Sequence, residues 1–339
     1  MSKLSDAMSL QDFFVDFTDY LHRTHTTMVD NWNNPLELTL NSFFRMSELA
    51  NNAMENFINH QNGTIGLLFG NPMMHQTPDI ETNVSVPSRQ GTGKVALITG
   101  GIGGIGTEIC KKLHDNGHQV IATYISIEAE KAAQWQQDRL VEGLDIELVE
   151  CDVTCYDTCK KTCKQIEKQF SRIDILVNCA GITRDATLRK LQPENWRAVL
   201  NTNLNSVFNV TRNVIDGMIK RGYGRIINIS SVNGQKGQFG QTNYSTAKAG
   251  IIGFSKALAL EVADSGITVN TVCPGYVGTS MVEAIPDDIK NSIIAKIPAG
   301  RLAKPVEIAE AVAFLAQENS AYITGSEISI NGGLFTGIA

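Results

Sequence analysis

Short apolar runs alternate with longer, helix-length segments from Lys94 to the end of the chain. Most of the apolar runs are continuous stretches of Val, Ile and Leu, which is the pattern of parallel strands covered on both faces. Helix-length segments between successive strands are typical of a doubly wound α/β fold. We therefore predict a parallel sheet of about seven strands, at residues 94–99, 119–124, 146–151, 173–178, 224–230, 267–273 and 327–331.

The first 61 residues follow a different pattern, in which apolar positions recur at helical spacing. Ser9 and Asp12 have the spacing of a capping box that opens one helix, and Asn34 with Pro35 opens a second. Two amphipathic helices of this size cannot enclose a core alone. We expect residues 1–61 to form a helical extension that packs on a neighbouring subunit, the following domain, a partner protein or a lipid-like surface.

The composition changes near residue 90, where we place a domain boundary. Residues 1–90 carry four Lys and Arg against ten Asp and Glu, whereas residues 91–339 carry equal numbers of each sign. All seven Cys follow residue 90, while seven of the 13 Phe precede it. Residues 62–92 lack sustained periodicity and are rich in Gly, Pro, Asn, Ser and Thr, so we predict a linker there and an α/β domain over residues 93–339.

Charge and hydropathy disfavour several classes of partner. A net charge of −6 argues against a nucleic-acid surface. The acidic polar face of the N-terminal helices argues against a membrane-surface helix, which is usually rich in Lys and Arg. No stretch approaches 18 consecutive apolar residues, and the start of the chain has no apolar leader. We therefore expect no transmembrane segment and a cytoplasmic protein with reduced thiols.

A glycine-rich loop joins the first predicted strand to a helix expected from Thr107 to Asn116. Glycines here allow a tight turn, a close approach of backbone to a pyrophosphate and close packing of helix on strand. Because the loop opens a β-α-β unit, we interpret it as a dinucleotide-binding loop and the fold as Rossmann-type. Its candidate cofactor contacts are Gly100, Gly101, Ile102, Gly103, Gly104, Ile105 and Gly106.

The end of the second predicted strand bears on the choice of cofactor. A site that prefers NAD places an acidic residue there, which accepts a hydrogen bond from the ribose 2′-hydroxyl. No acid stands at the strand end, although Glu128 and Glu130 follow shortly, and no Arg is present; Ser126 and Lys131 are the obvious partners for a 2′-phosphate. We therefore predict NADPH as the cofactor, with NADH as the alternative.

A Tyr and a Lys four residues apart, Tyr244 and Lys248, are predicted to share one face of a helix. An ammonium beside a phenol favours the phenolate, so we expect Lys248 to lower the pKa of Tyr244 from its usual value near ~10. A Tyr tuned in this way can exchange protons at neutral pH. Ser231 stands 13 residues upstream at the end of a predicted strand, where its hydroxyl could hold a carbonyl oxygen beside Tyr244.

Four cysteines recur at every fourth position, at Cys151, Cys155, Cys159 and Cys163. Cys151 ends a predicted strand, and the other three lie on successive turns of a predicted helix. Their side chains therefore do not converge on one point as paired metal ligands do. We interpret them as small buried hydrophobic residues and assign no metal.

Taken in order, these motifs resemble the short-chain dehydrogenase/reductase family over residues 94–339. The resemblance rests on the glycine-rich loop, Asn178-Cys179-Ala180-Gly181, Asn203, Ser231, Tyr244 and Lys248. Within that family, residues 182–185 and 231–244 look very like the NADPH-dependent acetoacetyl-CoA reductases of polyhydroxybutyrate synthesis. The sequence departs from the pattern at Cys179, where the family usually has Asn, and around residues 124–131, which lack the Arg those reductases use near the 2′-phosphate.

The resemblance implies a role for each matching position. Tyr244 would donate a proton to a ketone oxygen as hydride arrives from the nicotinamide, Ser231 would stabilise the charge developing on that oxygen, and Lys248 would bind the nicotinamide ribose. Asn203 would position the water through which Lys248 is reprotonated, or would be a helix-kink Asn. The further implied cofactor contacts are Asp152, Val153, Asn178, Ala180, Gly181, Pro274, Gly275 and Val277.

The resemblance also implies a reaction, the reduction of acetoacetyl-CoA to (R)-3-hydroxybutyryl-CoA by a homotetramer. The implied acyl-CoA contacts, each of which could equally be loop scaffolding, are Asp185, Gln238, Phe239, Gln241 and Tyr276. The nearest alternative is a 3-oxoacyl-[acyl-carrier-protein] reductase, which is disfavoured because an acidic carrier needs a basic docking patch and the reductase region is charge-neutral.

A catalytically silent scaffold or docking protein is the alternative from another class, and the intact Ser, Tyr, Lys and Asn set argues against it. The N-terminal helices would dock a polymer granule, another enzyme of the pathway or a neighbouring subunit. This hypothesis rests on two Phe-rich stripes that are too small to fold alone.

Overall fold

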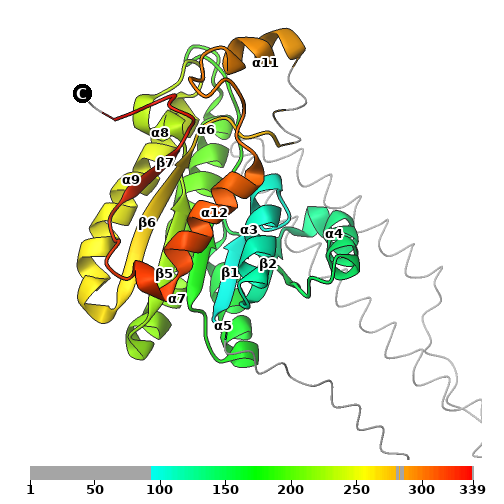
Figure 1. Ribbon diagram of the computed structural model, residues 1–339, viewed down its shortest axis with the longest axis vertical. Coiled ribbons are helices and arrows are strands. Elements are labelled where there is room, and N and C mark those ends of the chain that lie inside the picture. The colour runs from blue at the N-terminus through cyan, green and yellow to red at the C-terminus, as the bar shows by residue number, and fades with distance from the viewer. Residues whose placement is uncertain (1–92, 280–281, 283–285, 338–339) are drawn as a thin grey trace, which may run out of the picture. The chain divides into compact units, whose positions relative to one another are not determined.

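One parallel sheet runs through the described part of the computed structural model, which comprises residues 93–279, 282 and 286–337. The strand order is β3-β2-β1-β4-β5-β6-β7, so the direction of winding reverses between β1 and β4 (Figure 1). The strands are β1 (Val95–Thr99), β2 (Gln119–Tyr124), β3 (Glu147–Glu150), β4 (Ile175–Asn178), β5 (Gly224–Ile229), β6 (Ile267–Pro274) and β7 (Glu327–Ile330). The predicted doubly wound Rossmann-type sheet is confirmed, whereas the predicted extension at 1–61 and linker at 62–92 lie outside the described residues.

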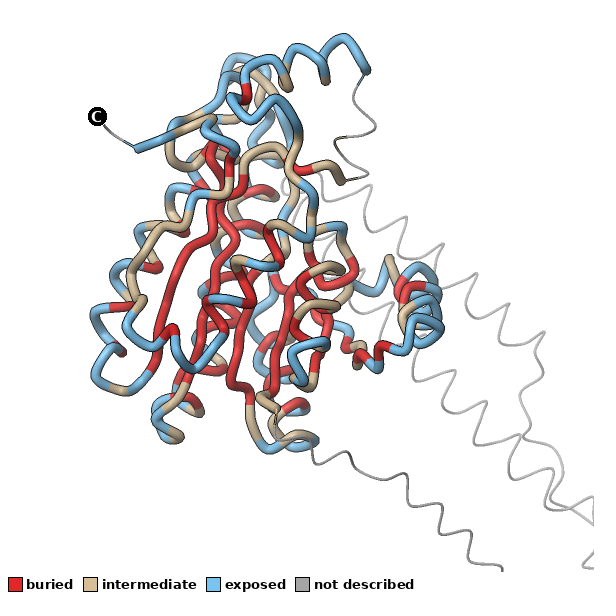
Figure 2. Tube along the Cα trace, viewed as in Figure 1, coloured by how far each residue is buried: buried red, intermediate tan, exposed pale blue. Residues whose placement is uncertain are grey.

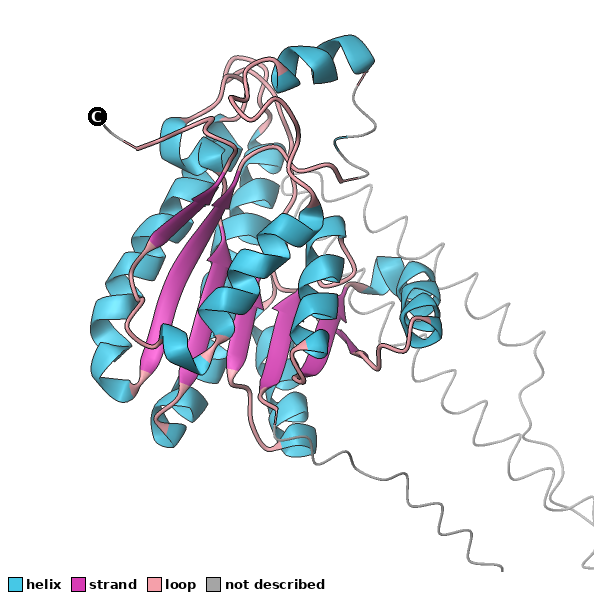
Figure 3. Cartoon of the chain, viewed as in Figure 1, coloured by secondary structure: helices cyan, strands magenta, loops and turns pink. Residues whose placement is uncertain are grey.

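Helices connect the strands and most of them lie against the sheet, whereas α11 lies beyond the ends of the strands (Figure 3). They are α3 (Gly104–Asp115), α4 (Ala129–Val141), α5 (Tyr156–Phe170), α6 (Pro193–Leu200), α7 (Ser206–Arg221), α8 (Val232–Lys236), α9 (Thr242–Val262), α11 (Asp287–Ile294) and α12 (Pro305–Ala316). Short turns add η1 (Ser126–Glu128), the π-helical η2 (Asn201–Asn205), η3 (Ala263–Ser265) and η4 (Glu318–Ser320). No helix among the described residues is long and apolar enough to cross a membrane.

Both faces of the sheet are buried, because successive side chains of a strand point to opposite sides. In β1, Ala96 and Ile98 pack with α3 and α12, whereas Val95 and Leu97 pack with α5, α7 and α9. Figure 2 shows the strands as a buried layer between helices whose outer sides are exposed. The two cores explain why the strands read as continuous apolar runs rather than as alternating ones.

Helix α3 begins three residues earlier than the sequence predicts. It opens at Gly104 with Gly103 as its N-cap, and the Thr107 amide donates to the Gly103 carbonyl at 2.7 Å. Three residues of the predicted loop therefore form the first helical turn. Glycine is a poor helix former, so its presence misplaced the boundary.

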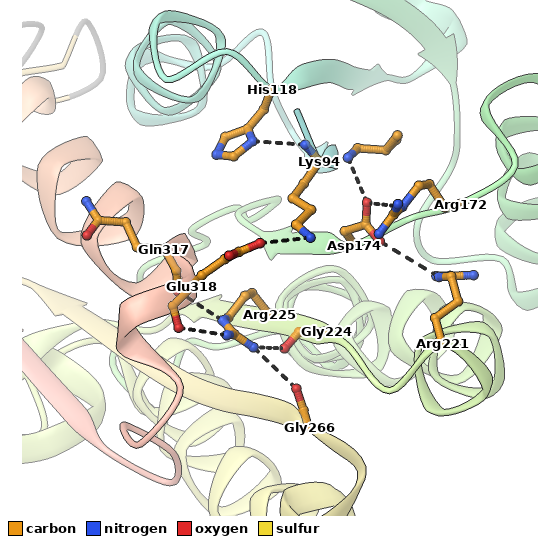
Figure 4. A network of polar contacts seen from close by, with 11 residues as sticks. Lys94, His118, Arg172, Asp174, Arg221, Gly224, Arg225, Gly266, Gln317 and Glu318 are labelled. Atoms are coloured by element: carbon orange, nitrogen blue, oxygen red, sulfur yellow. Dashed lines mark hydrogen bonds and ion pairs between the residues drawn. The ribbon is translucent and has the colours of Figure 1, made fainter. Parts of the chain in front are cut away.

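A polar network closes the amino-terminal edge of the sheet (Figure 4). The carboxylate of Asp174, which is fully buried, accepts from the Val95 amide at 3.0 Å and pairs with Arg172 and Arg221. Nearby, the buried Arg225 donates to four backbone carbonyls, those of Gly224, Gly266, Gln317 and Glu318. The network ties β1, β4 and β5 to the segment after α12 at the end opposite the strands' carboxyl termini.

The substitution Asp174→Asn is expected to destabilise the fold. It keeps the shape of the side chain but removes the carboxylate that pairs with Arg172 and one of the two carboxylates that pair with Arg221, the other being Glu167. We expect unfolding free energy to fall by about 3 kcal/mol, the lower end for a broken buried pair, because both arginines are partly exposed. Urea unfolding at constant slope measures the change.

Asp216→Asn is the matched control, because Asp216 pairs with Arg212 on an exposed helix face. It should cost less than about 1 kcal/mol. Equal losses from the two substitutions would contradict the structural role of Asp174.

Candidate active site

The glycine-rich loop follows β1 at the carboxyl edge of the sheet, where the winding reverses and ligands of this fold class bind. Gly100 has a φ of +62°, which favours glycine, and a Cβ on Gly106 would lie 2.3 Å from the Gly100 carbonyl oxygen. No side chain caps α3, so the amides of its first turn are available to an anion. The loop fits the predicted pyrophosphate site.

Two threonine hydroxyls outside the predicted cofactor contacts fix this loop to its neighbours. Thr99 Oγ1 accepts from the backbone amides of Cys179 and Ala180, at 3.0 and 3.2 Å. Thr123 Oγ1 accepts from the Gly100 amide at 3.2 Å. These contacts hold the loops after β1 and β4 together on the two sides of the switch point. The position of Thr99, at the end of a strand and directly before a glycine-rich loop, could have predicted its contact with the neighbouring loop.

The predicted proton-transfer residues converge after β5. Ser231 precedes α8, and its hydroxyl is hydrogen-bonded to the phenol of Tyr244 near the start of α9. The Lys248 ammonium, one turn further along α9, lies 5.6 Å from the centroid of the Tyr244 ring and donates to the Ile229 carbonyl at 2.8 Å. The structure thus brings Ser231, Tyr244 and Lys248 together.

Burial changes the acid–base character of this group. Desolvation raises the pKa of Tyr244 to about 12, with the Ser231 hydrogen bond acting in the opposite direction. Desolvation also lowers the pKa of Lys248 to about 8. The expectation of a depressed Tyr244 pKa is therefore wrong for this structure, because the cost of burying a phenolate is the largest effect on the group. Tyr244 is protonated at neutral pH and can act as a proton donor.

Asn203 is fully buried in the π-turn η2 and fits both roles considered for it. Its side-chain amide makes a pair of hydrogen bonds with the backbone of Ile182, accepting at 2.7 Å and donating at 2.8 Å. A Cβ on Gly181 would lie 3.0 Å from Asn203 Oδ1 and 3.6 Å from Lys248 Nζ. Asn203 therefore marks a break in regular helix and also borders the Lys248 ammonium.

The other predicted cofactor contacts lie on loops at the same edge or beside it. Asn178 ends β4, but its side chain donates to Asn228 and Thr211 in the core, so only its backbone faces the loop region. Asp152 is exposed and caps the turn at Thr154. Pro274 is the last residue of β6, and the remaining positions follow β3, β4 or β6 and are Val153, Ala180, Gly181, Gly275 and Val277.

Ser126 and Lys131, the predicted 2′-phosphate partners, both follow β2 and are exposed. Ser126 opens η1, and the Lys131 ammonium pairs with Glu128 at 3.0 Å. An exposed pair of this kind is worth less than about 1 kcal/mol, so a phosphate can displace it.

Three of the five predicted acyl-CoA residues lie in one polar chain. Gln241 donates to the Asp185 carboxylate at 2.7 Å and accepts from the Asn233 side chain at 2.9 Å. Asn233 also hydrogen-bonds Tyr276, whose pKa is raised by burial. Asn233 was not among the predicted site residues. The other two predicted residues do not join this chain and are strongly exposed, namely Gln238 and Phe239.

The cysteines form no metal site within the described residues. Cys151, Cys159 and Cys163 are buried, as predicted, but Cys155 is exposed. Cys155 is the N-cap of α5, so it lies at the solvent end of the helix rather than beneath it.

Comparison with known proteins places this site in a family. The model of the enoyl-(acyl carrier protein) reductase family matches residues 100–335. An acetoacetyl-CoA reductase of Allochromatium vinosum is 57% identical over 242 residues, 71% of this chain and 98% of the relative. One from Cupriavidus necator is 50% identical over 246 residues, 73% of this chain and all of the relative. A 3-oxoacyl-[acyl-carrier-protein] reductase of Escherichia coli is 46% identical over 243 residues, 72% of this chain and 98% of the relative.

The fold and the Ser231, Tyr244 and Lys248 group define a nicotinamide-dependent oxidoreductase. With these relatives, the chain belongs to the short-chain dehydrogenase/reductase family. The family model begins at residue 100, so residues 1–92 lie outside the matched region.

The pKa of about 8 at Lys248 predicts an alkaline limb in the pH dependence of reduction. Lys248 is charged below this pKa and neutral above it, so the proton supply to Tyr244 is lost as pH rises. We expect kcat/KM for the reduced cofactor, which reports groups of the free enzyme, to be level below pH ~7.5 and to fall about tenfold per unit above pH ~8.5.

The Tyr244 pKa of about 12 adds no second limb in this range. Circular dichroism at each pH controls for unfolding. A profile that stays level to pH ~10 would contradict the assignment to Lys248.

Proposed function

We propose that the protein reduces acetoacetyl-CoA to (R)-3-hydroxybutyryl-CoA with NADPH, supplying polyhydroxybutyrate synthesis in the cytoplasm. The observation that carries the proposal is the group of Ser231, Tyr244 and Lys248 beside the Asp185–Gln241 chain. The substrate is supported by relatives called acetoacetyl-CoA reductases that are 50–57% identical over nearly their whole length.

A nicotinamide cofactor bound at the glycine-rich loop would supply the hydride. Tyr244, which is protonated at neutral pH, donates its phenolic proton to the ketone oxygen. The Ser231 hydroxyl donates to the same oxygen and stabilises the charge that develops there. Lys248 would return a proton to Tyr244 and hold the ribose of the cofactor. Asn203 holds the loop at Ile182 and would position the water through which Lys248 is reprotonated.

NADPH is supported by the residues that follow β2. Ser126 offers a hydroxyl and Lys131 a cation held by a weak surface pair, and no acid stands at the end of β2 to repel a phosphate. Glu128 lies near and pairs with Lys131, so a bound phosphate would exchange one anionic partner of Lys131 for another.

The proposed reaction is tested by initial rates with acetoacetyl-CoA and either NADPH or NADH. We expect NADPH to give the higher kcat/KM, and Tyr244→Phe to lower kcat at least about a hundredfold, because the variant keeps the ring but lacks the acidic proton. Tyr223→Phe is the matched control, since this phenol lies in the network at the opposite edge.

Faster turnover with NADH would contradict the assignment of Ser126 and Lys131 but leave the reaction standing. Turnover of a 3-oxoacyl carrier-protein thioester alone would move the function to the carrier-protein reductases, to which the chain is also similar. No cofactor oxidation with any 3-oxoacyl thioester would favour a silent scaffold.

For residues 1–90 we propose a docking role outside catalysis, between subunits of a tetramer or onto a granule or pathway enzyme. The family model does not include these residues. Apolar surface for subunit contacts is also present on the reductase domain, where the exposed Tyr156 and Phe208 stack at 6.2 Å between ring centroids.

Deleting residues 1–90 is expected to change the molar mass in solution or the location in cells while kcat/KM stays within about twofold, because the matched domain has its own core. Light scattering and kinetics on the same samples measure both. The paired substitution Phe13→Ser and Phe17→Ser is a milder form of the test. Loss of cofactor binding on deletion would contradict the docking role.

A further inference from the structure

Asn233 connects the residue that polarises the ketone with the predicted substrate loops. It lies two residues after Ser231, and its own amide N–H donates to Ser231 Oγ at 3.1 Å. Its side chain is 6% exposed and donates through Nδ2 to Gln241 Oε1 at 2.9 Å. Gln241 in turn donates through Nε2 to the Asp185 carboxylate at 2.7 Å.

The Asp185 carboxylate determines which group donates and which accepts in each hydrogen bond of this series. A carboxylate accepts hydrogen bonds and cannot donate them, so Asp185 requires the NH₂ group of Gln241. The carbonyl of Gln241 then faces Asn233 and requires the NH₂ group of Asn233. Each amide therefore has one allowed orientation, although an isolated amide would have two.

Asn233 also interacts with Tyr276. The interaction lowers the pKa of the Tyr276 phenol, against the rise that burial causes. The side chain of Asn233 is therefore adjacent to two predicted acyl-CoA residues, Gln241 and Tyr276.

One polar atom in this hydrogen-bonded series has no partner within the part of the chain that the structure describes. Asn233 Oδ1 is buried and has no hydrogen-bond partner among the described residues. Buried polar atoms are rarely left unpaired, and an unpaired one indicates a water or a ligand group that arrives on binding. An acyl thioester of CoA carries both kinds of partner, carbonyl acceptors for a phenol and amide donors for a carbonyl oxygen.

We propose that Asn233 is a positioning residue for the acyl thioester, which it serves by holding Gln241 in one orientation beside Tyr276 and by presenting its own side-chain carbonyl oxygen to the ligand. This role rests on the proposed function. It requires the donor character of the Asn233 side chain as well as its shape.

Asn233→Asp tests that requirement, since the two side chains have the same shape. A carboxylate cannot donate to Gln241, so at pH ~8 we expect KM for acetoacetyl-CoA to rise about tenfold or more while KM for NADPH stays within about twofold. A protonated carboxyl group can donate one hydrogen bond. The ratio of variant to wild-type KM should therefore fall toward one as pH is lowered to ~5.5.

Asn270→Asp is the matched control. Asn270 is equally buried, donates to the Ile323 carbonyl and accepts from the Ser326 amide, on β6 away from the site. It should lower the melting temperature and leave the KM ratio for acetoacetyl-CoA near one at every pH. A double-mutant cycle with Asn233→Ala and Gln241→Ala should show effects on KM that are less than additive.

A KM ratio for Asn233→Asp that stays near one, or a raised ratio that does not change with pH, would overturn the proposal alone. Additive effects in the cycle would do the same, as would an Asn233→Asp protein that fails to fold while Asn233→Ala folds with unchanged KM. A wild-type enzyme that does not reduce acetoacetyl-CoA would overturn the proposed function, and this proposal with it.

Discussion

Burial of both faces of the parallel sheet is the constraint on which the rest of the structure depends. With one core against α3 and α12 and another against α5, α7 and α9, the charged groups of the sheet gather at its two ends, and the polar side chains inside it, such as Asn178 and Asn228, hydrogen-bond to one another. The amino-terminal edge holds two polar groups, Asp174, which bonds the Val95 amide and two arginines, and Arg225, which donates to four backbone carbonyls. The carboxyl edge holds loops whose amides and hydroxyls are open, and the candidate site is there.

The same burial sets the electrostatics of the site. A buried ammonium and a buried phenol are each pushed toward their neutral forms, so the pKa of Lys248 falls to about 8 and that of Tyr244 rises to about 12. These values suit reduction, because a proton donor must hold its proton until charge develops on the ketone oxygen. The Ile229 carbonyl at the end of β5 is the polar group that holds the Lys248 ammonium in place.

The direction of two hydrogen bonds determines how the predicted substrate residues are oriented. The exposed carboxylate of Asp185 accepts from the Gln241 amide, and the carbonyl of Gln241 accepts from the Asn233 amide, so one carboxylate fixes the orientation of both amides. Relatives that reduce acetoacetyl-CoA and relatives that reduce carrier-protein thioesters are both similar to this chain, so the proton-transfer group by itself does not distinguish their substrates.

The sequence by itself determined the sheet, the glycine-rich loop and the identity of the proton-transfer residues. The strand predictions agree with all seven strands to within two residues, because most strands are buried on both faces and so form unbroken runs of Val, Ile and Leu, although the edge strands β3 and β7 are only partly buried. The predicted start of α3 was three residues too late, because glycine has a low helix propensity and two glycines lie in the first turn of the helix.

Only the tertiary structure decided the sign of the Tyr244 pKa shift, the exposure of Cys155 and the place of Asn233. Desolvation depends on what packs around a group, and Gln241 and Asp185 are 56 residues apart in sequence. A local pattern describes which side a residue faces, whereas its partners are set by the fold that brings distant loops together.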